Sequence, residues 1–170
     1  MATLTGAQLA QNIQQMILEL KKICEGVDED TASRAPAGRW SPKEILSHLL
    51  GPEGSNHLLI LQSFIYHETP VLDIEAENPF FSEKRAGTPF AKLLAEVEME
   101  YELIAEFAAG LPEGQLDRRA QIPMLKDTPF GEYPTLATWI GLLGGEEGSH
   151  LQFHTEQMRE ILQALGASVQ

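Results

Sequence analysis

The sequence has 170 residues, of which 43% are hydrophobic, and its formal net charge at pH 7 is -13. A chain of this length and apolar content is most simply one compact domain with its own core, so we expect a single domain over residues 1–170. The negative charge disfavours binding to nucleic acid and to an anionic membrane surface, and the sequence contains no basic run that would reverse this.

Three further features of the sequence concern the cellular compartment. Cys24 is the sole cysteine, so the fold does not depend on an intramolecular disulfide or an oxidising environment. No apolar run approaches the roughly 20 residues that a membrane-spanning helix requires. Residues 1–6 have neither the basic start nor the apolar stretch of a signal peptide. We therefore expect a cytoplasmic protein with no membrane or nucleic-acid partner.

The first predicted helix runs from about Thr5 to Gly26. Apolar residues recur along it at steps of three and four, which is the spacing of one face of an α-helix. They are Leu9, Ile13, Met16, Leu20 and Cys24. Because Cys24 lies on this apolar face, we interpret it as a packing residue rather than a reactive thiol. A polar, proline-containing connection follows over residues 28–38.

The second predicted helix has the clearest start signal in the chain. Ser41 suits the N-cap, Pro42 suits the first helical position, and Glu44 completes a capping box. The apolar pattern continues to Tyr66, but the sequence Gly-Pro-Glu-Gly at 51–54 interrupts it. We expect one bent helix from Ser41 to Tyr66, with two shorter helices as the alternative.

A third helix is predicted between two long connections. Residues 67–87 and 113–133 lack sustained periodicity and contain prolines, so each is expected to be a long crossover. The helix between them opens at Thr88 and ends near Gly110. Its row of glutamates, at positions 96, 98, 100, 102 and 106, is interpreted as a solvated face rather than a metal site.

The last predicted helix starts at Pro134 and runs to about Leu165. Four glycines between positions 141 and 148 cost about 1 kcal/mol each relative to alanine in a helix, and they indicate close packing or a local distortion. Residues 142–150 loosely resemble residues 49–57, a similarity that we interpret as coincidence. No strand is predicted. The fold class is therefore all-α, a four-helix bundle with long crossover connections between helices 2 and 3 and between helices 3 and 4.

His150 and His154 are the first candidate metal ligands. Because they are four residues apart on a predicted helix, their imidazoles project from the same face and can reach one metal ion. His48 lies among apolar residues of the second predicted helix and can supply a third imidazole. Three imidazoles leave a coordination position open, which is the composition of a catalytic site. The alternative is that each is an ordinary hydrogen-bonded core histidine, and His57 and His67 are interpreted as packing or surface residues.

Two motifs in the chain resemble the DinB/YfiT-like superfamily. Residues 38–49, Gly-Arg-Trp-Ser-Pro-Lys-Glu-Ile-Leu-Ser-His-Leu, are similar to its tryptophan–serine helix start followed by histidine and leucine. Residues 150–158, His-Leu-Gln-Phe-His-Thr-Glu-Gln-Met, are similar to its His-x3-His-x2-Gln-aliphatic signature in the last helix. The sequence Phe130-Gly131-Glu132 is similar to the usual approach to that helix. The resemblance covers the whole chain in order.

This resemblance implies a four-helix bundle that holds a divalent metal ion through His48, His150 and His154. Zinc or nickel is the expected ion, and iron is a further option. Members with known activity include thiol-dependent S-transferases and a mycothiol-dependent isomerase, in which the metal binds and activates a low-molecular-weight thiol. The resemblance therefore implies a thiol-dependent S-transferase with a small thiol and an electrophile as its partners. It also implies a homodimer.

Three acidic residues lie about one helical turn before the candidate ligands. Glu44 precedes His48, and Glu146 and Glu147 precede His150, so each can accept a hydrogen bond from an imidazole or act as a general base. Each is equally well interpreted as a solvated acid. Two other functions also stay open: a non-enzymatic metal-binding or ligand-binding bundle or sensor, and a metal-dependent hydrolase. The shape of the pocket distinguishes them.

Overall fold

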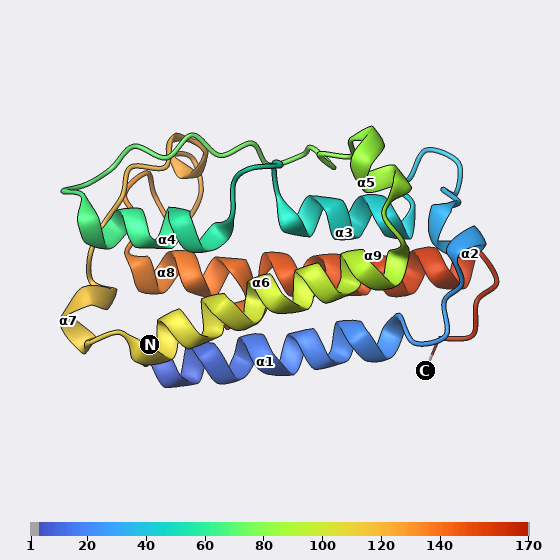
Figure 1. Cartoon of the computed structure of the whole chain (residues 1–170). Helices are drawn as coiled ribbons and strands as arrows, with labels where there is room; N and C mark the ends of the chain where they lie inside the picture. The colour runs from blue at the N-terminus through green and yellow to red at the C-terminus, as the bar shows by residue number, and fades with distance from the viewer. Residues whose placement is uncertain (1–3, 170) are drawn as a thin grey trace.

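The chain forms a bundle of four helical rods, two of them continuous and two interrupted (Figure 1). The computed structural model describes residues 4–169. The rods are α1 (Gly6–Ile23); α3 (Pro42–Leu50) with α4 (His57–Tyr66); α6 (Phe90–Gly110); and α8 (Leu136–Ile140), the π-helix η2 (Gly141–Gly145) and α9 (His150–Ala164). Within residues 4–169 there is no β-strand, only two isolated β-bridges, so the all-α bundle is confirmed.

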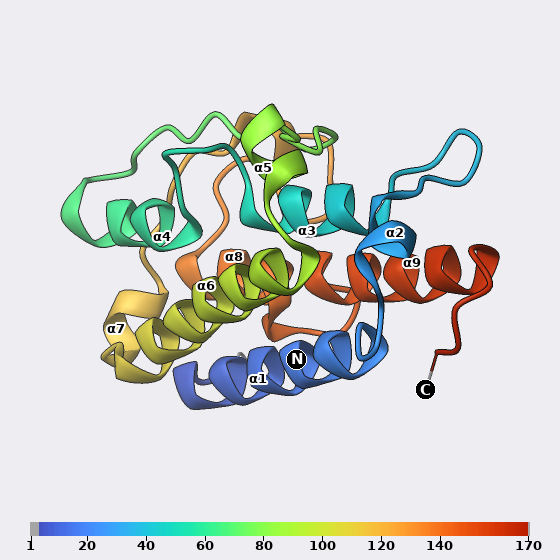
Figure 2. The same ribbon diagram turned by 45° about the vertical axis from the view of Figure 1, so that its right-hand side comes forward.

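Helices α1 and α6 pack side by side along their length, as Figures 1 and 2 both show. The capping box of Thr5 and Gln8 starts α1, and the predicted apolar face of this helix is buried apart from Met16, which is half-buried. The approach is closest at Gly6, where an added Cβ would lie 2.0 Å from the carbonyl oxygen of Ala108. Cys24 is buried at the end of this face, and burial raises the pKa of its thiol to about 12, as expected of a packing residue.

The second rod corrects the expectation of one bent helix from Ser41 to Tyr66. The capping box is present, since the Glu44 carboxylate accepts a hydrogen bond from the Ser41 N–H at 2.7 Å. However, α3 ends at Leu50, because Gly51 adopts a φ of 76° that stops the helix. A new helix, α4, starts where the Asn56 side chain accepts a hydrogen bond from Leu59 N–H. The alternative of two shorter helices is therefore confirmed.

The fourth rod is also broken, whereas the sequence predicted one helix from Pro134 to Leu165. It passes from α8 into the π-helix η2 and leaves helical geometry over residues 146–149, before Ser149 caps α9. The cause is close packing on α1. An added Cβ at Gly145 would lie 2.7 Å from Leu9 Cδ2, and the Asn12 side chain donates a hydrogen bond to Gly145 O at 2.7 Å. Both expectations from the glycines, close packing and local distortion, are confirmed.

The two long connections contain short helices and contact each other. These helices are α5 (Glu83–Gly87), α7 (Glu113–Leu116) and the 3-10 helix η1 (Pro123–Leu125), and α2 (Glu29–Ser33) lies between α1 and α3. The isolated bridge between Val71 and Gln121 joins the connections, with Leu72 N–H donating to Gln121 O at 2.8 Å. The first connection therefore runs over α4 and α3, and the part of the second that follows α7 lies against it, so that the two form one layer of connections (Figure 1). Helix α7 itself lies apart from this layer, near the end of α6.

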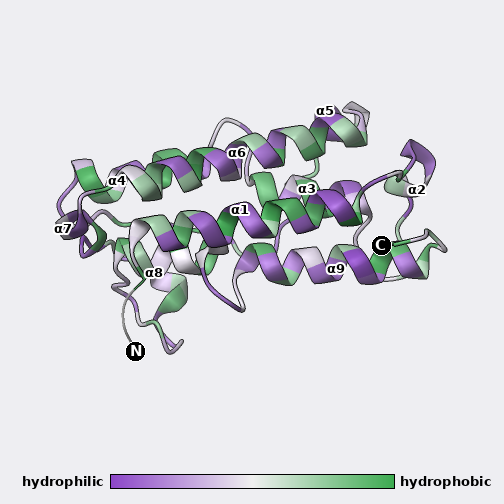
Figure 3. Ribbon diagram, turned by 90° about the horizontal axis from the view of Figure 1, so that it is seen from below, coloured by the Kyte–Doolittle hydropathy of each residue, from purple (hydrophilic) through white to green (hydrophobic). Residues whose placement is uncertain are grey.

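Hydrophobic and hydrophilic residues alternate along the rods in the manner of helices that bury one face (Figure 3). The buried faces meet in one hydrophobic cluster that spans all four rods. No helix in the described part of the chain is long and apolar enough to cross a membrane.

Candidate metal centre

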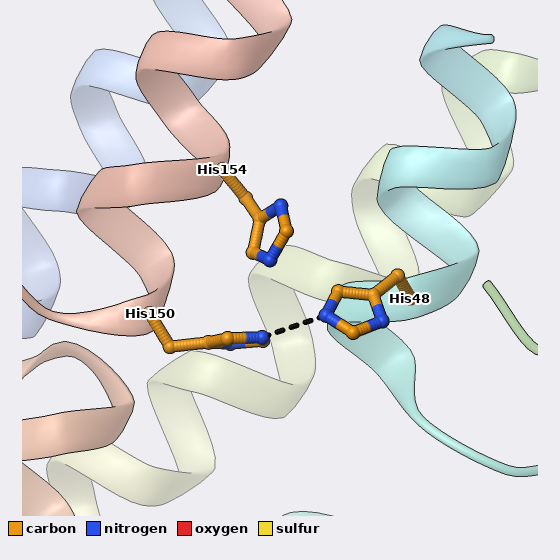
Figure 4. Close-up of side chains that lie close together, drawn as sticks. All are labelled: His48, His150 and His154. Carbon is orange, nitrogen blue, oxygen red and sulfur yellow. Dashed lines mark hydrogen bonds between the residues drawn. The ribbon is translucent and has the colours of Figure 1, made fainter. Parts of the chain in front are cut away.

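His48, His150 and His154 come together where α3 faces α9 (Figure 4). One ring nitrogen from each lies within 4.8 Å of the corresponding atoms of the other two. The closest pair is His48 Nε2 and His150 Nε2, which are 2.7 Å apart. The break before α9 makes His150 the first residue of that helix, and His154 follows one turn later on the same face. The structure thus brings together all three ligands predicted from the sequence.

Hydrogen bonds orient two of the three imidazoles. His48 Nδ1 lies 2.6 Å from the carbonyl oxygen of Asn78, so this nitrogen carries the proton and donates it. His154 Nδ1 lies 2.7 Å from Gln157 Oε1 and donates in the same way. His154 Nε2 therefore keeps its lone pair, and the lone pair of His48 Nε2 accepts a hydrogen bond from His150 Nε2. His150 Nδ1 is buried and has no hydrogen-bond partner within the described residues.

Burial keeps the three imidazoles neutral at pH 7. Loss of hydration lowers the pKa of His48 and is the largest cause for the other two as well. The pKa of His154 falls to about 4, although its hydrogen bond with Gln157 acts in the opposite direction. The pKa of His150 is lowered further by the neighbouring charges of His154 and His48 in their protonated forms. Neutral imidazole is the form that binds a metal ion.

Aromatic side chains cover the outer faces of the cluster. The Trp40 ring is nearly parallel to that of His154, with centroids 6.1 Å apart and an interplanar angle of 13°. It also lies 5.0 Å from the His48 centroid. Phe80 stacks on His48 with an interplanar angle of 5°. The sequence assigned Trp40 only to a helix start and Phe80 to a connection, so neither contact was predicted.

A buried arginine fixes the segment that holds His48. Arg85 Nη1 donates to the carbonyl oxygens of Gly51 at 2.6 Å, Ser47 at 2.9 Å and Phe80 at 3.2 Å. The Ser47 hydroxyl also donates to Phe80 O, at 3.0 Å. These bonds hold the chain near Asn78 against the C-terminal end of α3. They also give a cationic donor to carbonyls that have no hydrogen-bond partner within the helix. Nothing local in the sequence marks Arg85, since its partners are 34 to 38 residues away in α3.

The three predicted acids lie outside the histidine cluster. Among residues 4–169, no carboxylate oxygen joins the group of ring nitrogens within 4.8 Å. The Glu44 carboxylate is occupied by the capping box of α3. Glu146 and Glu147 are exposed in the break before α9. A role for Glu44 or Glu147 as a base or as a hydrogen-bond partner of an imidazole stays a prediction.

A cavity of about 310 Å³ adjoins the cluster and reaches His48 and His150. Both helix breaks contribute to its wall, with Gly51, Pro52 and Ser55 from one and Gly148 from the other. The layer of connections contributes residues 73–76, Met124 and Leu125, and the rods contribute Ile60, Trp139, Leu142 and Leu143. The interruptions in the two rods therefore leave an open space beside the three imidazoles.

His57 also lines this cavity, although the sequence indicated only a packing or surface role. Its Nε2 donates to Leu49 O at 2.8 Å, so its Nδ1 is the ring's acceptor. Its main-chain N–H donates to the Glu100 carboxylate at 2.6 Å. His57 begins α4 after one break as His150 begins α9 after the other. The similarity of residues 49–57 and 142–150, interpreted as coincidence, thus marks two segments with the same structural role.

A helical bundle in which three neutral histidines converge beside a cavity is typical of metal-dependent proteins. The family model of the DinB superfamily matches residues 12–153, and the chain therefore belongs to the DinB superfamily. No curated protein matches the chain.

One solved structure with a similar fold is YfiT from Bacillus subtilis, described as a probable metal-dependent hydrolase with an unusual four-helix bundle topology. The similarity has a TM-score of 0.77 and covers 96% of this chain and 89% of that chain. The two sequences are 18% identical, so the likeness supports the fold alone.

Proposed function

We propose that the protein is a metal-dependent enzyme in which His48, His150 and His154 hold one divalent ion. The observation that carries the proposal is the set of three neutral ring nitrogens within 4.8 Å of one another at the edge of a cavity. The residues fit such an ion, because Nδ1 of His48 and of His154 donates its proton to a hydrogen bond and each Nε2 carries the lone pair that coordinates. The ion would replace the hydrogen bond between His48 Nε2 and His150 Nε2. Zinc and nickel are the proposed ions.

The residues around the three histidines have separate roles in this chemistry. When bound, the divalent ion supplies positive charge that favours the deprotonated form of a small nucleophile. Asn78 and Gln157 hold the His48 and His154 rings in one orientation. Trp40 and Phe80 shield the faces of the imidazoles from water. The cavity then holds the electrophilic group next to His48 and His150.

Water is the first candidate for the nucleophile, which makes the reaction a hydrolysis. Among residues 4–169, no arginine or lysine lines the cavity, and the net charge of the chain is -13. Both features disfavour small thiols such as glutathione that carry carboxylates. The description of YfiT as a probable metal-dependent hydrolase supports the same reaction type.

Thiol transfer is the second candidate, and the size of the cavity favours it. A volume of about 310 Å³ is at the lower end of ordinary small-molecule sites and accommodates a small neutral thiol beside an acceptor. A purely structural or sensing site is disfavoured, because such sites are closed by a fourth protein ligand and this cluster adjoins an open cavity.

The metal site is tested by measuring zinc and nickel bound to the purified chain and to the variants His48→Ala and His154→Ala. One ion per chain is expected for the original sequence, and loss of most of it in both variants. The matched control is His67→Ala, which removes an exposed histidine far from α9 in sequence and should retain the ion. Full occupancy in both cluster variants would contradict the proposal.

The reaction is tested with the metal-loaded and metal-free chain on two probes. Nitrophenyl acetate reports hydrolysis, and chlorodinitrobenzene with mercaptoethanol reports thiol transfer. Metal-dependent acceleration of the first probe alone supports hydrolysis, whereas acceleration of the second alone supports thiol transfer. If neither rate depends on the metal, the enzymatic proposal is overturned while the metal site stands.

A further inference from the structure

We propose that the cavity beside the three histidines binds a small cationic amine with an apolar body. Binding of the amine does not depend on the function proposed above. That the amine is a substrate rests on that function. Its basis is the distribution of apolar, acidic and hydrogen-bonding groups over the cavity wall.

The inner wall of the cavity is apolar. Its larger side chains are Ile60, Ile74, Phe80, Trp139, Leu142 and Leu143. Water in such a space makes few hydrogen bonds, so an apolar group that displaces it gains free energy. The volume of about 310 Å³ is suited to a ring or a short branched chain rather than to a peptide or a nucleotide.

The charged groups on the wall have one sign. Asp73 and Glu75 line the cavity and are both exposed, so they mark its solvent side, whereas His48 is 4% exposed and marks the inner side. The Glu75 carboxylate accepts a hydrogen bond from the Asn78 side chain at 3.0 Å, which holds it near the wall. Arg85 is not part of this wall, and its guanidinium donates to the carbonyl oxygens of Ser47, Gly51 and Phe80.

The neutral polar groups complete the pattern. His57 donates through Nε2 to Leu49 O, so the ring offers Nδ1 as an acceptor on the cavity wall. Together with the two carboxylates it matches an ammonium group, which has three donors and no acceptor. Trp139 is 6% exposed, and its buried indole N–H has no hydrogen-bond partner among the described residues.

The test ranks three probes that share one apolar body: phenylpropylamine, phenylpropanol and phenylpropanoate. Calorimetric titration of the full chain at pH 7 and low salt is carried out after chelator treatment, since a carboxylate can otherwise coordinate a metal ion directly. Because two carboxylates lie near the ammonium group in a partly hydrated site, we expect the amine to bind about tenfold more tightly than the carboxylate probe. The affinity of the alcohol should lie between these two. The amine and the alcohol should keep this order in the zinc-loaded chain.

Paired variants locate the effect. Asp73→Asn with Glu75→Gln should bring the three affinities to within about twofold of one another, because the opposing charges are removed. The matched control, Glu106→Gln with Glu113→Gln, removes the same net charge from exposed positions outside the cavity and should keep the tenfold preference. Leu142→Trp fills the cavity from a half-buried position and should abolish binding of all three probes.

Three results would overturn the inference: equal affinity for all probes, tightest binding of the carboxylate, or the same change in the paired variants as in their control. Absence of binding in the original chain also overturns it. Because the ranking is made without metal and without turnover, its failure is distinguishable from failure of the metal site or of the reaction.

Discussion

Helices α1 and α6 run without interruption over 18 and 21 residues, whereas the other two rods are each broken midway. The continuous pair packs by buried apolar side chains and by the close approach at Gly6. The broken pair carries the three histidines, the cavity and the buried hydrogen bonds of Arg85. All four rods supply apolar burial, but only the broken pair also gives up helical hydrogen bonds, and the site lies at those interruptions.

This comparison predicts where a core truncation has its largest effect. Ile13 is fully buried on α1, so Ile13→Ala should lower the free energy of unfolding by about 2–5 kcal/mol through lost burial and a residual cavity. Leu18→Ala on the same helix is the control, because Leu18 is 63% exposed and its truncation should cost less than about 0.5 kcal/mol. Denaturant unfolding measures both values. Similar costs for the two variants would contradict the role given to the buried face.

The broken pair should depend on its polar contacts in addition to its apolar burial. Arg85→Met leaves the carbonyls of Gly51 and Ser47 without their donor, so we expect a loss of about 1–3 kcal/mol in stability. We also expect weaker metal binding, because the chain that holds His48 is released. Lys84→Met at the neighbouring exposed position is the control. If Arg85→Met binds the metal as tightly as the original chain does, the hydrogen bonds of Arg85 do not position His48.

Acid should destabilise the metal-free chain through the histidines. Their pKa values are lowered in the folded state, so between pH 6.5 and about 4 the unfolded chain binds more protons than the folded chain. Stability is therefore fully present above pH 6.5 and is lost as the pH falls, with a slope of up to about 1.4 kcal/mol per pH unit for each histidine. Unfolding measured at pH 7 and pH 5 tests this. The variant with all three histidines replaced by glutamine should lose distinctly less stability over the same interval.

The smallest expected effect separates two of the three predicted acids, Glu44 and Glu147. Glu44→Ala removes half of the capping box of α3 and should cost about 0.5–1 kcal/mol. Glu147 is exposed, so Glu147→Ala should change stability by less than about 0.5 kcal/mol. Measured rates with the metal-loaded variants check the base role separately. A hundredfold loss of rate at full metal occupancy in either variant would identify that acid as the base.

Local signals predicted the helices and the three histidines. The predictions that were wrong concern the continuity of the second and fourth rods. The capping box at Ser41 and the apolar spacing of α1 are local, and both are present in the structure. The sequence at 51–54 predicted an interruption, but the choice between a bend and a break depends on Gly51 adopting a positive φ. The glycines at 141–148 indicated close packing or a distortion, but the place of the break at 146–149 was not predicted, and it follows the contact of Gly145 with Leu9 and Asn12 of the distant α1.

The surroundings of the histidines were less predictable than the histidines themselves. His48, His150 and His154 are marked by helical spacing and by motif, whereas Phe80 and Arg85 reach the site from a connection without periodicity. The similarity of segments 49–57 and 142–150 was a usable signal for His57. The similarity became interpretable only from the structure, in which His57 and His150 each begin a helix after a break.

The most direct test of the account is a crystal structure of the zinc-loaded chain, with diffraction measured on both sides of the zinc absorption edge. We expect one anomalous peak in contact with ring nitrogens of His48, His150 and His154, with the cavity open beside it. A chain with no peak at the three histidines, or with a peak closed off by a fourth protein ligand, would contradict it.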